Sequence, residues 1–262
     1  MEKKKLWWRI RGLSELNVRF DSNIERVVES QLKKSGKIRI LEIGFGEGRL
    51  LLDLQTLFPK NLELFGINFT KEHGMHQRSD FAKNAKIFGL KPIKKLPKPF
   101  FYDAGQGLHF KNRSIDVVLS QVAFHYVSDK ARLLEEIWRV LTVGGIAFVH
   151  IETVGNDDTL PDFMEISHET PRFVIYKKGK IVKLSSIIKQ CRKKGFDIKF
   201  IRPKGHERKP NLIMRKNTIK PLKLNLTFDP ISTFNLTKIR GEDKHKTTGN
   251  GWWGTRSVYH TK

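Results

Sequence analysis

The sequence predicts an α/β protein organised around one doubly wound, mostly parallel sheet. Short apolar segments rich in β-branched residues alternate five times with amphipathic helical segments between residues 24 and 151. The first apolar segment also runs into a turn with three alternating glycines, in the stretch ILEIGFGEGRLL, before the next helical pattern begins. With 39% hydrophobic residues, 18 phenylalanines among them, the chain can bury a core for such a sheet.

The expected strands are short, and their apolar composition is typical of parallel strands covered on both faces. The clearest is SIDVVLS, at residues 114–120. In chain order, the five expected strands are residues 37–43, 62–67, 99–103, 114–120 and 146–151.

The expected helices lie beside these strands in the sequence. Ile24, Val27, Val28 and Leu32 form the apolar stripe of the first helix, and Gly36 follows as the residue that ends it. A proline, a glycine and a glycine pair end the next three helices. The four expected helices are residues 24–34, 49–58, 71–88 and 129–141.

The alternation stops after the fifth strand. Residues 156–171 are expected to form an insertion or lid, and 173–176 a further strand; a helix at 183–194 then precedes a closing pair of strands at 197–201 and 211–214. The chain thereby divides into an N-terminal helical or cap segment, a ligand-binding domain that includes the lid, and a basic C-terminal tail. These three parts are residues 1–36, 37–215 and 216–262.

Charge is the unusual property of the composition. The chain has 50 Lys and Arg against 27 Asp and Glu, a formal net charge of +23. Residues 172–223 alone hold 18 basic and two acidic residues. An excess of this size is typical of proteins with a polyanionic partner, so we expect RNA or another polyanion to bind segment 172–223. A solubility surface, or a lysine-rich proteome, is the alternative explanation.

Several classes of protein are disfavoured by composition. The single cysteine, Cys191, permits no internal disulfide, and the nine histidines show no paired ligand spacing, so no metal site is predicted. No segment approaches the roughly 20 apolar residues of a membrane span. The basic N-terminus also lacks the apolar run of a signal peptide. We therefore expect a cytoplasmic protein without membrane association.

The glycine turn at residues 44–48 has to be assigned to one of several ligand classes. A P-loop requires Gly-Lys-Ser/Thr after a longer loop, and Gly48-Arg49-Leu50 supplies neither the lysine nor the hydroxyl. A dinucleotide fingerprint requires glycine at position 49, where arginine stands. The spacing is instead G-x-G-x-G, with Glu42 two residues before the first glycine.

This acidic-x-G-x-G-x-G motif resembles the first motif of the class I S-adenosylmethionine-dependent methyltransferases. Three further stretches are similar to the same family: Tyr102-Asp103-Ala104, LHFKNRSIDVVLSQVAFHYV at 108–127, and RVLTVGGIAFV at 139–149. The resemblance spans about residues 38–152. It implies a Rossmann-like fold with a seven-stranded, mostly parallel sheet, and S-adenosyl-L-methionine as the cofactor.

The resemblance also implies which residues contact the cofactor. Glu42 would face the cationic ammonium, and the glycine turn would approach the methionine portion. Asp103 would accept a hydrogen bond from the adenine amine, the backbone amide of Ala104 would contact the ring, and Ser120 and Gln121 would line the open side. The full implied set is Glu42, Gly44, Phe45, Gly46, Gly48, Asn68, Phe69, Asp103, Ala104, Ser120 and Gln121.

Asn68 departs from the family pattern, in which Asp or Glu ends the second strand and binds the ribose hydroxyls. An asparagine can still accept one hydrogen bond and donate another. It lacks the charge-assisted strength of a carboxylate. If Asn68 contacts the ribose, the change Asn68→Asp is expected to preserve or tighten cofactor binding.

Methyl transfer from a sulfonium chiefly requires alignment of the acceptor, and a base where the acceptor's pKa demands one. His125 is the best-placed catalytic candidate because it follows the fourth strand. Residues 120–125 lack the Pro-Pro-aromatic box of enzymes that methylate amino groups of nucleic acids. The leading expectation is a methyltransferase acting on an anionic substrate, RNA first. A small-molecule methyltransferase and a non-catalytic binding protein with the same fold are the alternatives.

Overall fold

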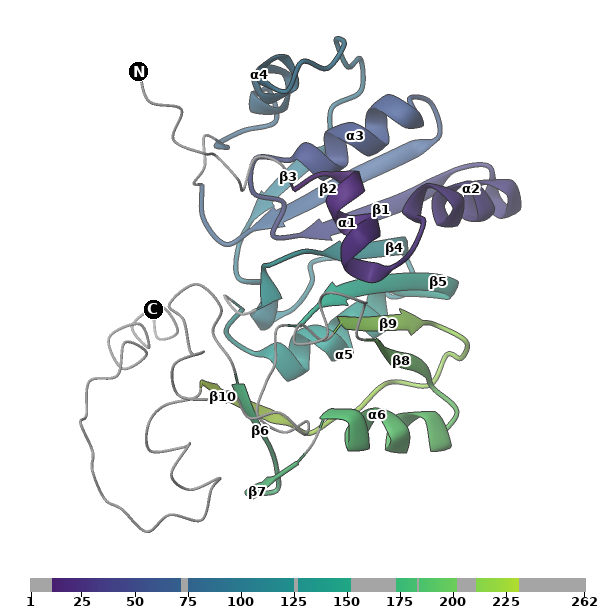
Figure 1. Cartoon of the computed structure of the whole chain (residues 1–262), viewed down its shortest axis with the longest axis vertical. Coiled ribbons are helices and arrows are strands. Elements are labelled where there is room, and N and C mark those ends of the chain that lie inside the picture. The colour runs from purple at the N-terminus through teal and green to yellow at the C-terminus, as the bar shows by residue number, and fades with distance from the viewer. Residues whose placement is uncertain are drawn as a thin grey trace, which may run out of the picture.

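A seven-stranded sheet forms the centre of the computed structural model, which describes residues 11–71, 75–124, 127–151, 173–182, 184–201 and 211–230 (Figure 1). The strands of this sheet are β1 (Ile38–Ile43), β2 (Leu62–Asn68), β3 (Lys98–Phe101), β4 (Ile115–Ser120), β5 (Leu141–His150), β8 (Asp197–Ile201) and β9 (Asn211–Arg215). Their order across the sheet is β3-β2-β1-β4-β5-β9-β8.

The sheet is doubly wound, because the chain proceeds outward from β1 to β3 and then returns to place β4 on the other side of β1. The first five strands are all parallel, whereas β9 is antiparallel to both of its neighbours. The mostly parallel seven-stranded sheet predicted from the sequence is confirmed. In such a sheet, ligands bind at the carboxyl ends of the strands where the winding direction changes, which here is between β1 and β4.

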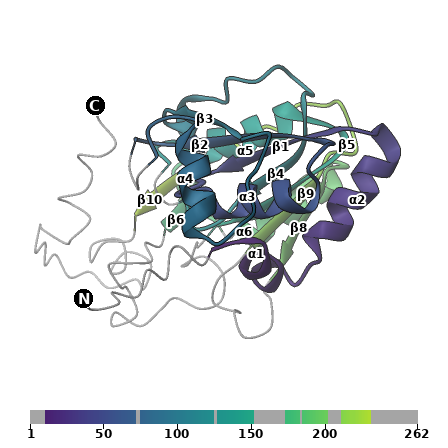
Figure 2. The ribbon, with the colours of Figure 1, turned by 90° about the horizontal axis from the view of Figure 1, so that it is seen from above.

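Helices cover both faces of the sheet (Figures 1 and 2). One face packs against the apolar sides of the first four helices, where for example Phe20 and Phe81 join Ile40 in one core cluster. On the other face, Ile137 and Ile187 join Leu41 in a second cluster. The helices are α1 (Leu13–Phe20), α2 (Ile24–Ser35), α3 (Arg49–Leu57), α4 (Asp80–Ile87), α5 (Lys130–Val140) and α6 (Leu184–Lys193).

The helix expected at residues 71–88 is shorter than the apolar pattern indicated. The regular helix α4 begins only at Asp80. The Asp80 carboxylate accepts hydrogen bonds from the backbone N–H groups of His76 and Gln77, at 3.0 and 3.1 Å. These bonds fold the residues before α4 into a turn around its first residue, so the helix cannot extend backwards. The expected C-terminal end near Gly89 is confirmed.

The boundary between α5 and β5 also differs from the expectation. The glycine pair 144–145 was expected to end the helix, but α5 ends at Val140 and β5 begins at once. Gly144 lies within the strand with φ +87°, and its N–H donates to the Lys216 carbonyl at 2.7 Å. The glycines therefore accommodate an irregularity in the pairing of β4 with β5 rather than a helix end.

A second, small sheet forms after β5, in the order β10-β6-β7, with β6 (Phe173–Lys177), β7 (Lys180–Ile181) and β10 (Thr227–Pro230). The strand expected at 173–176 is confirmed as β6. Its partner β10 comes from the segment expected to be a tail, and Leu222, Leu224 and Leu226 just before it are buried in the core. Packing with the domain thus continues to residue 230, beyond the boundary expected at 216.

Among the residues that the structure describes, no helix is long and apolar enough to cross a membrane.

Candidate functional site

The glycine turn predicted from the sequence lies directly after β1 and is held by the end of β2. The N–H of Gly44 donates to the Ile67 carbonyl at 2.7 Å, and the N–H of Gly48 closes the turn on the Phe45 carbonyl at 2.7 Å. Gly44, Gly46 and Gly48 all have positive φ, at +77°, +53° and +83°. Residues that carry a Cβ rarely adopt this backbone conformation, which explains why glycines alternate in the turn.

The three glycines differ in what surrounds them. A Cβ on Gly44 would collide with the Ala123 side chain, and one on Gly48 would collide with the Phe81 ring. At these two positions glycine therefore permits close packing. A Cβ on Gly46 would meet no heavy atom within 4 Å. The open space beside Gly46 is where a ligand can approach the turn.

Phe45, predicted among the cofactor contacts, has its ring in the core instead. Its side chain is buried, and the ring lies 5.5 Å from that of Phe81 and 6.3 Å from that of Phe101. Only its backbone can face a ligand at the turn. Phe69, at the end of β2, is by contrast 43% exposed and is free to contact one.

Glu42 is the buried carboxylate at the end of β1. It is only 4% exposed, and its Oε2 has no hydrogen-bond partner within the described part of the chain. Burial raises the pKa of the Glu42 carboxyl well above its usual value, and the nearby negative charge of Asp53 raises it further. A bare carboxylate held in this way is stabilised by a cationic ligand, which would supply the missing partner.

Asn68 lies at the end of β2, beside the glycine turn, and is 7% exposed. Its Oδ1 accepts a hydrogen bond from the Gly46 N–H at 3.0 Å, and its Nδ2 donates to the Gly46 carbonyl at 3.0 Å. The amide therefore pairs with both backbone groups of one glycine. The sequence had assigned this side chain to the ribose hydroxyls.

Asp103 and Ala104 follow β3, the strand next to β2. One oxygen of Asp103, Oδ1, accepts from the Gly105 N–H at 2.8 Å and from the Ser128 N–H at 3.4 Å. The first of these bonds caps a short 3-10 helix, Ala104–Gln106. No bond to the other carboxylate oxygen is found within the described residues, so Oδ2 can accept from a ligand.

Ser120 and Gln121 end β4, on the other side of β1, where Ser120 pairs with Ile43. Both side chains are buried. Neither the Ser120 Oγ nor the Gln121 Nε2 has a hydrogen-bond partner in the part of the chain that the structure describes. With Glu42, three buried polar groups without partners thus lie at the carboxyl ends of two neighbouring strands, beside the open face of Gly46.

A polar contact between Arg19 and His150, which the sequence did not predict, connects α1 to the carboxyl end of β5. Arg19 of α1 lies with its Nη1 3.2 Å from Nε2 of the fully buried His150, the last residue of β5. Nδ1 of His150 accepts from the Val122 N–H at 3.3 Å. Val122 has φ +53°, a strained value for a β-branched residue. The only signal in the sequence was a histidine at the end of the fifth strand.

Two predicted parts of the site lie outside the described residues. These are His125, the catalytic candidate, and the lid at 156–171. Within the described ranges, no group of three or more metal-binding side chains occurs. The expectation that the protein has no metal site stays a prediction.

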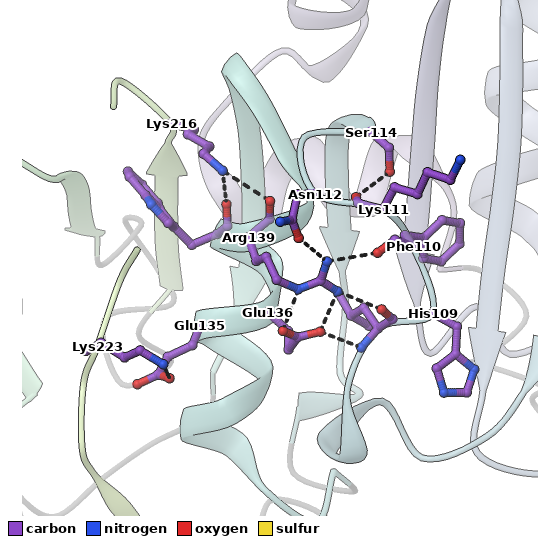
Figure 3. Close-up of polar contacts among 12 residues, drawn as sticks. His109, Phe110, Lys111, Asn112, Ser114, Glu135, Glu136, Arg139, Lys216 and Lys223 are labelled. Atoms are coloured by element: carbon purple, nitrogen blue, oxygen red, sulfur yellow. Dashed lines mark hydrogen bonds and ion pairs between the residues drawn. The ribbon is translucent and has the colours of Figure 1, made fainter. Parts of the chain in front are cut away.

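A groove of about 710 Å³ runs along α5 and shares no residue with the predicted cofactor set. Arg139 lines this groove, and Figure 3 shows its side chain at the centre of a network of polar contacts. The guanidinium bonds both oxygens of Glu136 at 2.7 Å and also donates to the carbonyls of Leu108 and Phe110 and to Asn112. Arg139 therefore ties the loop before β4 to α5, which joins two of the stretches on which the sequence resemblance rested.

The basic segment 172–223 presents a charged face on α6. Ile187, Ile188 and Cys191 face the core. Burial raises the pKa of the Cys191 thiol, and the charges of Lys177 and Lys194 act against this, so β6 and the end of α6 lie close together. The exposed cations of α6 and the β6–β7 turn have no acidic partner within the described residues; they are Lys178, Lys180, Lys189, Arg192, Lys193 and Lys194.

Lys216, also in that segment, has a structural role instead. It is 3% exposed, and its Nζ donates to the carbonyls of Trp138 and Arg139 at 2.7 and 3.1 Å (Figure 3). These are carbonyls at the end of α5 that no further helical turn could satisfy. Lys216 therefore cannot belong to a surface that faces phosphates.

Comparison with known proteins finds a matching family model and similar sequences. Residues 41–149 match the protein-family model described as "Methyltransferase domain". An uncharacterized protein of Methanocaldococcus jannaschii is 27% identical over 180 residues, which cover 68% of this chain and 75% of that protein. The ubiquinone/menaquinone biosynthesis C-methyltransferase UbiE of Geobacter is 25% identical over 158 residues, 58% of this chain and 60% of that enzyme.

Among solved structures, a putative S-adenosyl-L-methionine-dependent methyltransferase from Methanococcus maripaludis superposes with a TM-score of 0.46 at 16% identity. The superposition covers 75% of this chain and 86% of that protein.

Proposed function

We propose that the site at the ends of β1, β2 and β4 binds S-adenosylmethionine for methyl transfer to an anionic acceptor, because residues 41–149 match the family model of a methyltransferase domain. The observation that carries the assignment of the site is the turn at 44–48. Its open face at Gly46 lies beside three buried polar groups without partners.

The residues present fit the cofactor. Glu42 offers a buried carboxylate to the ammonium group of the methionine portion, and the uncovered backbone of Gly46 permits close approach of that portion. At the other end, the Oδ2 of Asp103 can accept from the adenine amine, and Ala104 can contact the ring. Ser120 and Gln121 then line the side of the site that faces the acceptor.

S-adenosylmethionine supplies a methyl group activated by a sulfonium, so the protein has chiefly to align the acceptor and exclude water. Ser120 and Gln121 can orient an acceptor through their unpaired Oγ and Nε2. His125 is proposed as the group that takes a proton from the acceptor, where the acceptor has one to lose. A methyl transfer without a general base leaves His125 as a residue that shapes the pocket.

For the acceptor we propose RNA. The support is the face of α6 and the β6–β7 turn, where cations gather that have no acidic partner in the described part of the chain, in a protein of net charge +23. Such a face suits the repeated phosphates of a nucleic acid better than the one or two charges of a metabolite.

A small molecule is the second candidate acceptor. A specific observation favours it: the Geobacter relative that matches 58% of this chain is named a C-methyltransferase of ubiquinone and menaquinone biosynthesis. For such an acceptor, the basic face would serve solubility alone.

Cofactor binding is tested by the change Gly46→Leu. A Cβ at this position meets no heavy atom of the described residues within 4 Å, so we expect the fold to survive, although the positive φ costs about 1 kcal/mol of stability. The same side chain occupies the space assigned to the methionine portion. We expect calorimetric titration to show no S-adenosylmethionine binding by the variant. Wild-type affinity in the variant would move the cofactor to another site.

The acceptor is tested by transfer of a tritiated methyl group into fractionated cell RNA, protein and small-molecule extracts. Label in RNA supports the first candidate, and label in the small-molecule fraction supports the second. If no fraction is labelled although calorimetry shows cofactor binding, the chain is a binding protein with the methyltransferase fold.

A further inference from the structure

We propose that Asn68 is a positioning residue that clamps the glycine turn, and that its amide, rather than a carboxylate, is required for S-adenosylmethionine to bind. This inference rests on the proposed cofactor site. It differs from the ribose-binding role that the position has in the resembling family.

The geometry shows a matched pair of hydrogen bonds. Gly46 N–H donates to Oδ1 of Asn68, and Nδ2 of Asn68 donates to the Gly46 carbonyl, both at 3.0 Å. Rotating the amide by half a turn would bring donor against donor and acceptor against acceptor. The orientation is therefore fixed by Gly46 alone.

A carboxylate could form only half of this pair. It would accept from the Gly46 N–H, but its second oxygen would face the Gly46 carbonyl oxygen at the distance of a hydrogen bond, with no proton between them. Asn68 is 7% exposed, so water could not readily relieve the conflict. The turn would have to shift, and with it the open face of Gly46.

The clamp acts where the turn is otherwise least supported. Gly44 is held by Ile67, and the Glu47 carbonyl accepts from Asn84 of α4 at 2.9 Å. Gly46, between them, has only Asn68 as a hydrogen-bond partner for its backbone within the described residues. With a φ of +53° and no heavy atom within 4 Å of a Cβ built on it, Gly46 has no other support within the described residues for the peptide that would face the cofactor.

The amide also retains some capacity for the ligand. One lone pair of Oδ1 and one N–H of Nδ2 remain after the bonds to Gly46. A ribose diol could therefore meet one acceptor and one donor, in place of the two acceptors of a carboxylate.

The test compares Asn68→Asp with wild type by calorimetric titration of S-adenosylmethionine at several pH values. At about pH 8 we expect the variant to bind at least about tenfold more weakly, the cost typical of one buried hydrogen bond replaced by a repulsive contact. If Asn68 contacts only the ribose, affinity is preserved or tightened instead, and that result would overturn the clamp.

The pH dependence of cofactor affinity provides a second readout, because a variant whose structure was simply disrupted would not regain affinity in acid. A protonated carboxyl can donate to the Gly46 carbonyl and accept from its N–H, as the amide does. The ratio of wild-type to variant affinity should therefore fall toward one as pH is lowered from about 8 to 5. A ratio that stays constant also contradicts the proposal. Taking the ratio cancels the titration of groups common to both proteins, which near Asn68 are Glu42, Glu47, Lys71 and Asp103.

Two further variants control for folding. Asn68→Ala removes the clamp without adding a charge, and its affinity should be reduced about equally at every pH. Gln55→Glu changes another buried amide, whose Nε2 donates to the carbonyls of Phe58 and Pro59 at 3.4 and 3.0 Å, at the end of α3 away from the glycine turn. It should leave cofactor affinity unchanged, and circular dichroism checks that all three variants fold.

The clamp can also be separated from the proposed function. If the wild-type protein binds no S-adenosylmethionine, the cofactor assignment fails. The clamp can then be tested in the ligand-free protein by NMR. A side-chain amide proton of Asn68 should exchange with water more slowly than those of the exposed Asn61 and Asn112. Equally fast exchange would overturn it.

Discussion

At the residue scale, burial of the charged Glu42 carboxylate lowers the stability of the folded protein. The pKa of Glu42 is raised, chiefly by burial and then by Asp53, so the folded chain binds this proton more tightly than the unfolded chain does. Between the ordinary and the raised pKa, the folded protein therefore becomes less stable as pH rises. This is the reverse of the usual behaviour of a paired carboxylate, and it arises because Glu42 is buried with no hydrogen-bond partner for its Oε2 among the described residues.

The change Glu42→Gln is expected to separate stability from binding. Without cofactor, the variant should be about 1–3 kcal/mol more stable at neutral pH, because no charge has to be buried without a partner. Its affinity for S-adenosylmethionine should fall at least about tenfold, since the ammonium group loses its counter-charge. Chemical denaturation and calorimetry measure the two effects.

The pH dependence gives an independent check on Glu42. Wild-type affinity for the cofactor should decline as acid protonates Glu42, at a pH above the usual range of a carboxyl, while that of Glu42→Gln stays constant there. A variant that is less stable than wild type, yet binds equally well, would show that Glu42 has a protein partner.

Contacts between individual residues could be predicted from the sequence only in part. The positions of the glycines, Glu42 and Asp103 at strand ends could be predicted because their spacing is local, whereas their contact with the cofactor stays a prediction. The partner of Asn68 could not, because it depends on how the turn after β1 lies over the end of β2, more than 20 residues away in sequence. Arg19 and His150 are 131 residues apart, and no local pattern connects them.

At the element scale, the alternating strands and helices up to β5 were predictable because each has a continuous apolar pattern of its own. Of the three strands of the small sheet only β6 was predicted, since β6 is an apolar run, whereas β7 has two residues and β10 has the sequence TFDP. A strand of four residues containing proline has weak intrinsic preference, and it is stabilised by its pairing with β6 and by the packing of Phe228 against Phe124, with ring centroids 5.8 Å apart. Such tertiary support is not visible in a local window.

Arg139 connects two elements through the shape of its guanidinium, which bonds Glu136 at two positions and reaches two carbonyls of the loop before β4. The change Arg139→Lys keeps the charge but cannot make this planar set of bonds. We expect it to lower the free energy of unfolding by about 1.5–3 kcal/mol, the range for hydrogen bonds to a charged group.

Denaturant unfolding measures the effect of Arg139→Lys. Arg132→Lys, an exposed position on the same helix, is the matched control and should change stability by less than about 0.5 kcal/mol. Equal stability of the two variants would mean that the loop before β4 is held by its apolar contacts alone.

At the scale of the whole molecule, net charge and its distribution have different consequences. A net charge of +23 attracts any polyanion and lowers the stability of the compact state through self-repulsion. A binding face requires in addition that cations gather without acidic partners. Among the described residues, α6 and the residue after it meet this condition, because the apolar residues of α6 face the core and leave Lys189, Arg192, Lys193 and Lys194 toward the solvent.

The last prediction therefore separates local from total charge. Four cations of the proposed face and the neighbouring Lys177 of β6 are reversed to glutamate, and five exposed cations elsewhere are reversed in a control protein, so both variants carry the same net charge of +13, from +23 less two per substitution. The face variant changes Lys177, Lys178, Arg192, Lys193 and Lys194; the control changes Lys33, Lys34, Lys37, Lys60 and Lys91, in and after α2 and after α3 and α4.

RNA retention is measured for the three proteins across salt concentrations, beside cofactor affinity. If several cations of the face neutralise phosphates, the logarithm of wild-type affinity should fall with the logarithm of salt at about −0.7 per contact, or about −3 to −5 in all. The face variant should lose most of both affinity and slope, because the contacts themselves are gone. The control should retain the slope, since only long-range attraction has been reduced, and cofactor affinity should remain unchanged in both. Equal losses in the two variants, or no retention by wild type at about 0.1 M salt, would reject RNA as the acceptor and favour the small molecule.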